Sequence, residues 1–107
     1  MISFIYFSIE HLVMFVNTAF VNPTTGKENE IADVMNNFAK ALQGSEGLIR
    51  VHVLKEKGGN ALVGISMWEN EENFNRAMAR LAPSPASRSK DEAIHETPTV
   101  VRQFIEI

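Results

Sequence analysis

Residues 48–68 read LIRVHVLKEKGGNALVGISMW and contain the clearest hairpin pattern in the chain. Two runs rich in β-branched residues flank residues 57–60 (KGGN), whose glycines supply the positive φ angles that a tight hairpin turn needs. Arg50 and His52 alternate with apolar neighbours, which is typical of a strand with one polar face. The stretch therefore predicts an antiparallel β-hairpin.

A helix is expected directly after the hairpin. Asn70 is a residue type that caps helix N-termini, and Pro83 cannot continue a helix. Between them, apolar residues recur with the i, i+3, i+4, i+7 spacing of one buried helix face, at Phe74, Ala77, Met78 and Leu81.

Upstream of the hairpin, the pattern predicts a strand followed by another helix. Residues 14–21 (MFVNTAFV) are aromatic and β-branched, and Pro23 ends the run because proline cannot donate to a sheet. Residues 25–28 (TGKE) have capping-box spacing, so a helix is expected to begin there. Its buried face recurs with helical period, at Ile31, Val34, Met35, Phe38, Ala39 and Leu42, and Gly44 and Gly47 end it.

Downstream, residues 82–98 are rich in proline, serine and charge, and residues 99–107 predict the last strand. The capping-box spacing of residues 89–92 (SKDE) could start a short helix through His95. The order β-α-β-β-α-β predicts a ferredoxin-like α+β fold, a four-stranded antiparallel sheet with both helices on one face.

In the three predicted strands 14–21, 61–68 and 99–107, apolar residues occupy both the odd and the even positions, which point to opposite faces of the sheet. Both faces should therefore be covered. A second copy of the chain is the simplest cover, which predicts a homodimer of the α+β barrel type. Residues 1–13 (MISFIYFSIEHLV) are the alternative cover, and we treat them as an extension of uncertain structure ahead of a domain at 14–107. Glu10 interrupts this apolar run too early for a signal peptide or a membrane span.

Composition excludes several classes of function. With 107 residues and a net charge of −3, the chain has the size of one domain and lacks the basic surplus of nucleic-acid-binding proteins. It has no cysteine, which excludes disulfides and thiolate-bound metals and fits a reducing cytoplasm. Its three histidines lie far apart, so no structural metal is expected.

Residues 64–74 (GISMWENEENF) join a strand ending in tryptophan to an acidic helix start. This junction, within the layout of residues 14–107, resembles the antibiotic biosynthesis monooxygenase superfamily of dimeric α+β barrels. The resemblance implies a hydrophobic small-molecule substrate and two branches of chemistry. The haem-degrading branch uses an asparagine on the first strand, a tryptophan ending the third and a histidine on the second helix, of which Asn17 and Trp68 match. The histidine is absent, and Met78 is a weak substitute as iron ligand.

The cofactor-independent branch needs an apolar slot, a group that holds a phenolic oxygen, and a base. Asn17 could hold the oxygen, His52 or His95 could accept the proton, and aromatic residues could line the slot, namely Phe15, Phe38, Trp68 and Phe74. Packing is the slightly better interpretation of Trp68, and a solvated edge is the better one for His52. A non-catalytic small-molecule-binding module and an isomerase of the same architecture remain alternatives.

Overall fold

The structure is a computed structural model that describes residues 13–81 and 99–107. The elements follow the predicted order β-α-β-β-α-β: β1 (Phe15–Val21), α2 (Glu28–Leu42), β2 (Leu48–Lys55), β3 (Leu62–Trp68), α3 (Glu71–Leu81) and β4 (Val100–Ile105). The short helix predicted near residues 89–95 lies outside the described residues, and so does most of the 1–13 extension. Neither described helix is long and apolar enough to cross a membrane.

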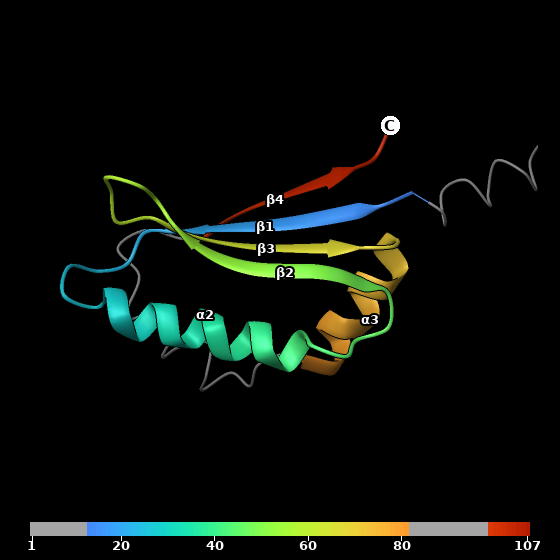
Figure 1. Ribbon diagram of the computed structural model, residues 1–107, viewed down its shortest axis with the longest axis horizontal. Helices are drawn as coiled ribbons and strands as arrows, with labels where there is room; N and C mark the ends of the chain where they lie inside the picture. The colour runs from blue at the N-terminus through green and yellow to red at the C-terminus, as the bar shows by residue number, and fades with distance from the viewer. Residues whose placement is uncertain (1–12, 82–98) are drawn as a thin grey trace, which may run out of the picture.

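The four strands form one antiparallel sheet in the order β2-β3-β1-β4, and both helices lie on the same side of it (Figure 1). This arrangement confirms the predicted ferredoxin-like fold. The central pairing places Phe15 of β1 opposite Trp68 of β3 on one side and Ile105 of β4 on the other. Strands distant in sequence thus meet at the centre of the sheet.

The β2–β3 hairpin forms as predicted. The Glu56 amide donates to the Ala61 carbonyl at 2.8 Å, and Gly58 takes a φ of 80°, which an L side chain disfavours. The pairing register shifts between Leu48 and Arg50, so the alternation of β2 is regular only beyond this point.

The two helix starts differ in how closely they follow prediction. The Asn73 amide donates to Asn70 Oδ1 at 2.9 Å, which confirms Asn70 as the cap of α3. The capping-box prediction at residues 25–28 is wrong: α2 begins at Glu28, and its N-cap residue, Lys27, makes no side-chain capping bond. The physical reason is a turn, closed by the Lys27 amide on the Thr24 carbonyl at 2.8 Å, in which Gly26 takes a φ of 85°.

The core divides into two clusters between the sheet and the helices. The first joins the sheet to α3 and the end of α2, through Phe15, Leu42, Trp68, Phe74 and Ala77. The second joins the start of α2 to the opposite end of the sheet, through Val21, Ile31 and Leu62. The space between these clusters holds the candidate site.

The other side of the sheet is the open face, which neither described helix covers (Figure 1). Register pairing assigns it these apolar residues: Val16, Phe20, Leu54, Val63, Ile65, Met67, Val100 and Phe104. Among them, Phe20 is 39% exposed and Phe104 is 52% exposed. The prediction of apolar residues on both faces of the sheet is therefore confirmed.

Candidate functional site

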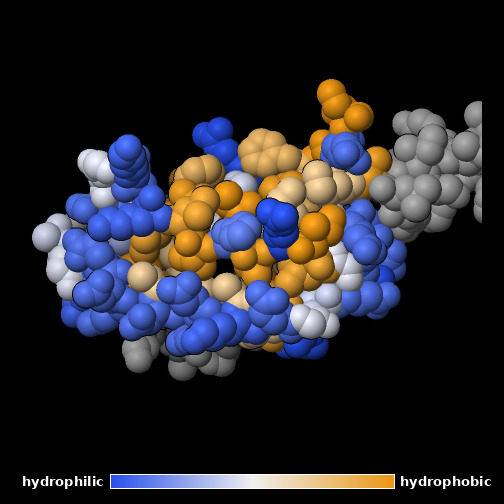
Figure 2. Space-filling view, in the orientation of Figure 1, coloured by the Kyte–Doolittle hydropathy of each residue, from blue (hydrophilic) through white to orange (hydrophobic). Residues whose placement is uncertain are grey.

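An apolar cavity of about 510 Å³ lies between α2 and the sheet. The space-filling view shows hydrophobic surface gathered over the sheet, with a hollow between it and the hydrophilic outside of α2 (Figure 2). No charged side chain is among the described residues that line the cavity: Asn17, Ala19, Val21, Ile31, Val34, Met35, Phe38, Ala39, Leu42, Val51, His52, Val53, Gly64, Ile65, Ser66, Leu81, Thr99 and Val101. Such a lining suits a hydrophobic ligand.

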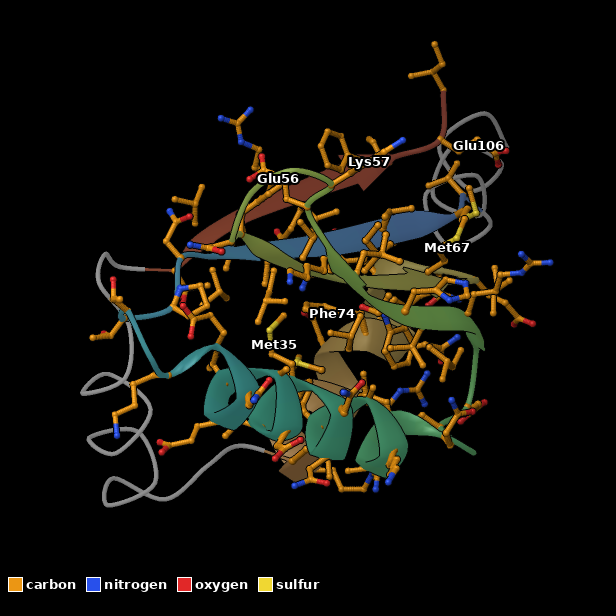
Figure 3. All side chains as sticks on the ribbon, turned by 60° about the vertical axis from the view of Figure 1, so that its left-hand side comes forward. Met35, Glu56, Lys57, Met67, Phe74 and Glu106 are labelled. Atoms are coloured by element: carbon orange, nitrogen blue, oxygen red, sulfur yellow. The ribbon has the colours of Figure 1, made fainter. Side chains whose placement is uncertain are left out.

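Short residues form the floor of the cavity. Ala19 and Gly64 lie opposite each other on β1 and β3, on the face that looks toward the helices. Met35 reaches toward them from α2 (Figure 3), and a methyl group added to Gly64 would come within 3.3 Å of its terminal carbon. The absence of a side chain at Gly64 therefore leaves the space that the cavity occupies.

Polar groups form the next row of the floor. Asn17 and Ser66 are direct register partners, so their side chains stand side by side. Gln103 of β4 is the partner of Asn17 on its other side, and its Nε2 donates to Asn17 Oδ1 at 3.1 Å. One end of the floor therefore offers hydrogen bonds to a ligand, and most of the remaining lining is apolar.

Trp68 does not line this cavity. Its side chain is fully buried and packs edge-on against Phe74, with ring centroids 5.9 Å apart. The indole Nε1 donates to Ser66 Oγ at 2.9 Å. Trp68 thus reaches the cavity only through Ser66, which differs from the expectation that Trp68 lines the substrate slot.

Of the three phenylalanines predicted to line a substrate slot, the structure places only Phe38 at the cavity. Phe15 and Phe74 pack against each other in the core with tilted rings, their centroids 5.0 Å apart, and they are 2% and 7% exposed. The reason is position along the sheet: Phe15 lies opposite Trp68 at the end that α3 covers. Phe38 lies on α2 and is 40% exposed.

The two candidate bases are not brought together at this site. His52 borders the cavity on β2, but Val51 and Val53 occupy the helix-side positions of that strand, so alternation turns the His52 side chain to the open face. His52 is exposed, as its interpretation as a solvated edge residue predicts. His95 lies outside the described residues.

The described residues around the cavity do not fit a haem iron. Met78 packs against the cluster that contains Trp68 and Phe74, and it is not among the cavity-lining residues. Ala77, beside it, is 4% exposed in the same cluster. No histidine ring faces the cavity from the described strands and helices, and they contain no group of three potential metal ligands. Axial ligation by a described side chain therefore has no candidate.

Sequence reasoning missed two polar residues: Ser66, which lines the cavity, and Gln103, which bonds to the cavity-lining Asn17. A signal existed for Ser66, which lies two residues before Trp68 and therefore shares its strand face. Gln103 similarly shares a face with Val101 and Ile105. Ser66 and Gln103 lie beside Asn17 because strands distant in sequence pair with each other. The spacing of residues within one strand does not predict this pairing.

The fold and the cavity together define a small ferredoxin-like α+β domain with an apolar chamber between its two layers. Residues 14–82 match the family model for antibiotic biosynthesis monooxygenases, and the chain belongs to this family. The match spans β1 to α3, and with it Asn17, Ser66 and Trp68. No curated protein matches the sequence.

Solved structures share the architecture. A variant of SnoaB, a cofactor-independent oxygenase from Streptomyces nogalater, is 25% identical, with a TM-score of 0.61 over 86% of this chain and 89% of that one. SO0527 from Shewanella oneidensis is 12% identical, with a TM-score of 0.77 over 89% of this chain and 92% of that one. Rv0793 from Mycobacterium tuberculosis is 11% identical, with a TM-score of 0.75 over 88% and 95% of the two chains. The last two show the fold alone.

Proposed function

We propose that this protein is a monooxygenase that acts on a hydrophobic hydroxyaromatic compound, of the phenol or quinol type, without a resident cofactor. The observation that carries the proposal is the apolar cavity with the Asn17 and Ser66 row at one end of its floor. Family membership and the similarity to a cofactor-independent oxygenase support it. The substrate's rings would lie over Ala19 and Gly64, and its oxygen would meet the polar row.

The chemistry needs little from the protein beyond binding and polarity. A deprotonated phenol or quinol is rich enough in electrons to reduce dioxygen directly, provided that water is kept away. If a ring C–H of the hydroxyaromatic compound becomes a carbonyl and the product is a quinone, one oxygen atom of dioxygen enters the product, the other leaves as water with the hydrogens of the broken C–H and O–H bonds, and the substrate supplies all four electrons. No external reductant is required for this balance.

Deprotonation is the step for which the described cavity offers no base. Hydrogen bonds to the charged form of a group favour that form, so donors on Asn17 and Ser66 would lower the pKa of a bound phenol. This effect works against the apolar lining, which raises the pKa of the phenol by disfavouring the anion. A substrate with an acidic hydroxyl therefore fits the site best, and His95 stays a prediction as the base.

Oxygen uptake tests the proposal. Purified protein is supplied with a panel of quinols and hydroxynaphthalenes under air, and the product is analysed for one atom of ¹⁸O from ¹⁸O₂. Asn17→Ala should reduce the turnover number by about 10²-fold, the usual cost of one donor to a developing oxyanion. Thr18→Val is the matched control, since Thr18 is next in β1 but on the open face, where its hydroxyl donates to the Arg102 carbonyl at 2.9 Å. Equal rates with and without protein for every compound would refute the proposal.

A binding module without catalysis is the second candidate, and the uncharged lining of the cavity favours it. Tight binding of the same compounds with no oxygen uptake would support this alternative. An isomerase requires a base at the substrate, so the described cavity gives it less support.

We propose further that two copies of the chain pair through their open faces. This face carries large side chains at high exposure: Val100 is 49% and Leu54 is 47% exposed, beside Phe20 and Phe104. Apolar patches of this kind mark interaction surfaces in folded proteins. Sedimentation at micromolar concentration should give the mass of a dimer, and a monomer at these concentrations would contradict the pairing.

The lack of cysteine is in keeping with a cytoplasmic location.

A further inference from the structure

We infer that Ser66 is a second hydrogen-bond donor to the ligand's oxygen, and that Trp68 is a positioning residue that acts on the ligand through Ser66. The inference rests on the proposed function of the cavity. It assigns the indole of Trp68 no direct contact with ligand, because Trp68 is fully buried and does not line the cavity.

The argument begins with the hydrogen bonds that Ser66 makes. A serine hydroxyl has one donor hydrogen and two acceptor positions. The Trp68 indole occupies one acceptor position at 2.9 Å, which turns the hydroxyl hydrogen away from the indole. Ser66 is 6% exposed and lines the cavity, and its hydrogen has no acceptor among the described residues. Buried hydroxyl groups are normally hydrogen-bonded, and a ligand oxygen would supply the acceptor that the Ser66 hydroxyl lacks.

A neighbouring residue likewise orients the Asn17 side chain, in this case Gln103 on β4. Gln103 Nε2 donates to Asn17 Oδ1 at 3.1 Å, which leaves the Asn17 NH₂ group as the part that has no partner among the described residues. Since Asn17 and Ser66 are register partners, the two unused donors stand next to each other on the cavity floor. Two neighbouring donors suit an oxygen that bears negative charge.

The test measures the acidity of a bound phenol, which requires no turnover. The probe is 4-nitrophenol, because its phenol and phenolate forms absorb at different wavelengths. Its absorbance is titrated with the protein in excess, over the pH range in which circular dichroism shows the fold intact. A donor that stabilises the phenolate lowers the probe's pKa, so Ser66→Ala should raise the bound pKa by about one unit.

Two further variants separate positioning from packing. Trp68→Phe keeps an aromatic ring in the core but removes the indole N–H. In a protein that retains Ser66, this change should raise the pKa of bound 4-nitrophenol. In the Ser66→Ala background the same change should have no further effect, because the indole's path to the ligand is already gone. Thr18→Val should leave the bound pKa unchanged, since it removes a similarly buried hydroxyl from the opposite face.

The outcomes distinguish this inference from the proposed function. If 4-nitrophenol and the larger hydroxynaphthalenes fail to bind the parent protein, the proposed function falls, and this inference falls with it. If the probe binds and its pKa is unchanged in Ser66→Ala, the roles inferred for Ser66 and for Trp68 are both refuted, and the proposed function stands. If Trp68→Phe shifts the pKa equally in both backgrounds, Trp68 acts independently of Ser66.

Discussion

Phe74 and Phe38 should separate the stability of this domain from its ligand binding. Phe74 is 7% exposed, and its ring contacts the rings of both Phe15 and Trp68. Each aromatic pair contributes about 0.5–1.5 kcal/mol beyond the burial of area. Replacing Phe74 with leucine removes both pairs and keeps an apolar side chain of similar size, so we expect a loss of about 1–3 kcal/mol in the free energy of unfolding.

The matched change is Phe38→Ala on the cavity wall. The Phe38 ring is 40% exposed and faces the cavity, so its removal takes away little protein contact. Alanine also has the higher helix propensity, by about 0.5 kcal/mol, so the net cost in stability should be at most about 1 kcal/mol. Affinity for a hydroxyaromatic ligand should fall about tenfold, which corresponds to ~1.4 kcal/mol of lost apolar contact.

Urea denaturation measures the change in the free energy of unfolding. It is carried out at one fixed protein concentration, since pairing of two copies would make stability depend on concentration. Titration with 4-nitrophenol measures the change in ligand affinity. Phe74→Leu should lower the urea midpoint by about 1 M with the slope unchanged, and it should leave ligand affinity unaltered. If Phe74→Leu weakened binding without loss of stability, Phe74 would line the ligand site and the core assignment would be refuted.

Three further changes test other parts of the molecule. Gly64→Ala should narrow the cavity against Met35, so affinity for a two-ring hydroxynaphthalene should fall more than affinity for 4-nitrophenol; an equal fall for both would contradict the position assigned to the floor. Asn70→Ala removes the cap of α3 and should cost about 1 kcal/mol, seen as a melting temperature about 4–8 °C lower at an unchanged bound pKa of 4-nitrophenol. Phe104→Glu places a charge on the open face and should convert the proposed dimer to monomer in sedimentation, whereas Lys57→Glu at the hairpin turn should not.

Local sequence patterns predicted most of the fold because each element carries its own signals. The glycines of residues 57–60, the Asn70 cap and the helical spacing of Phe74 and Ala77 all act over a few residues. The start of α2 was predicted wrongly because Thr25 has the right chemistry for a cap but is followed by Gly26 in a positive-φ turn. The spacing of the capping residues alone does not predict the backbone conformation of Gly26, which lies between them.

The site was harder to predict because it depends on register. Asn17 was identified as an unusual polar residue in an apolar strand, and it lines the cavity. Its partner Ser66 lies 49 positions later in the chain, and only strand pairing brings the two together. Phe15 was expected at the ligand for its residue type, whereas its position along β1 puts it under α3. Residue type indicates what a side chain can do, and register decides where it does it.

The role of β4 follows from the same register. The family match ends at residue 82, yet the group that fixes the Asn17 amide is Gln103, in the last strand. β1 is central in the sheet only because β4 pairs along its outer side. The orientation of one proposed ligand donor, Asn17, is therefore set by a strand outside the matched segment, and that of the other, Ser66, is set by the Trp68 indole within it. Gln103 lies beside Asn17 on β4, whereas Trp68 lies two residues beyond Ser66 on β3, and each bonds to a different one of the two donor residues. Losing one orienting group should therefore leave the other donor in place.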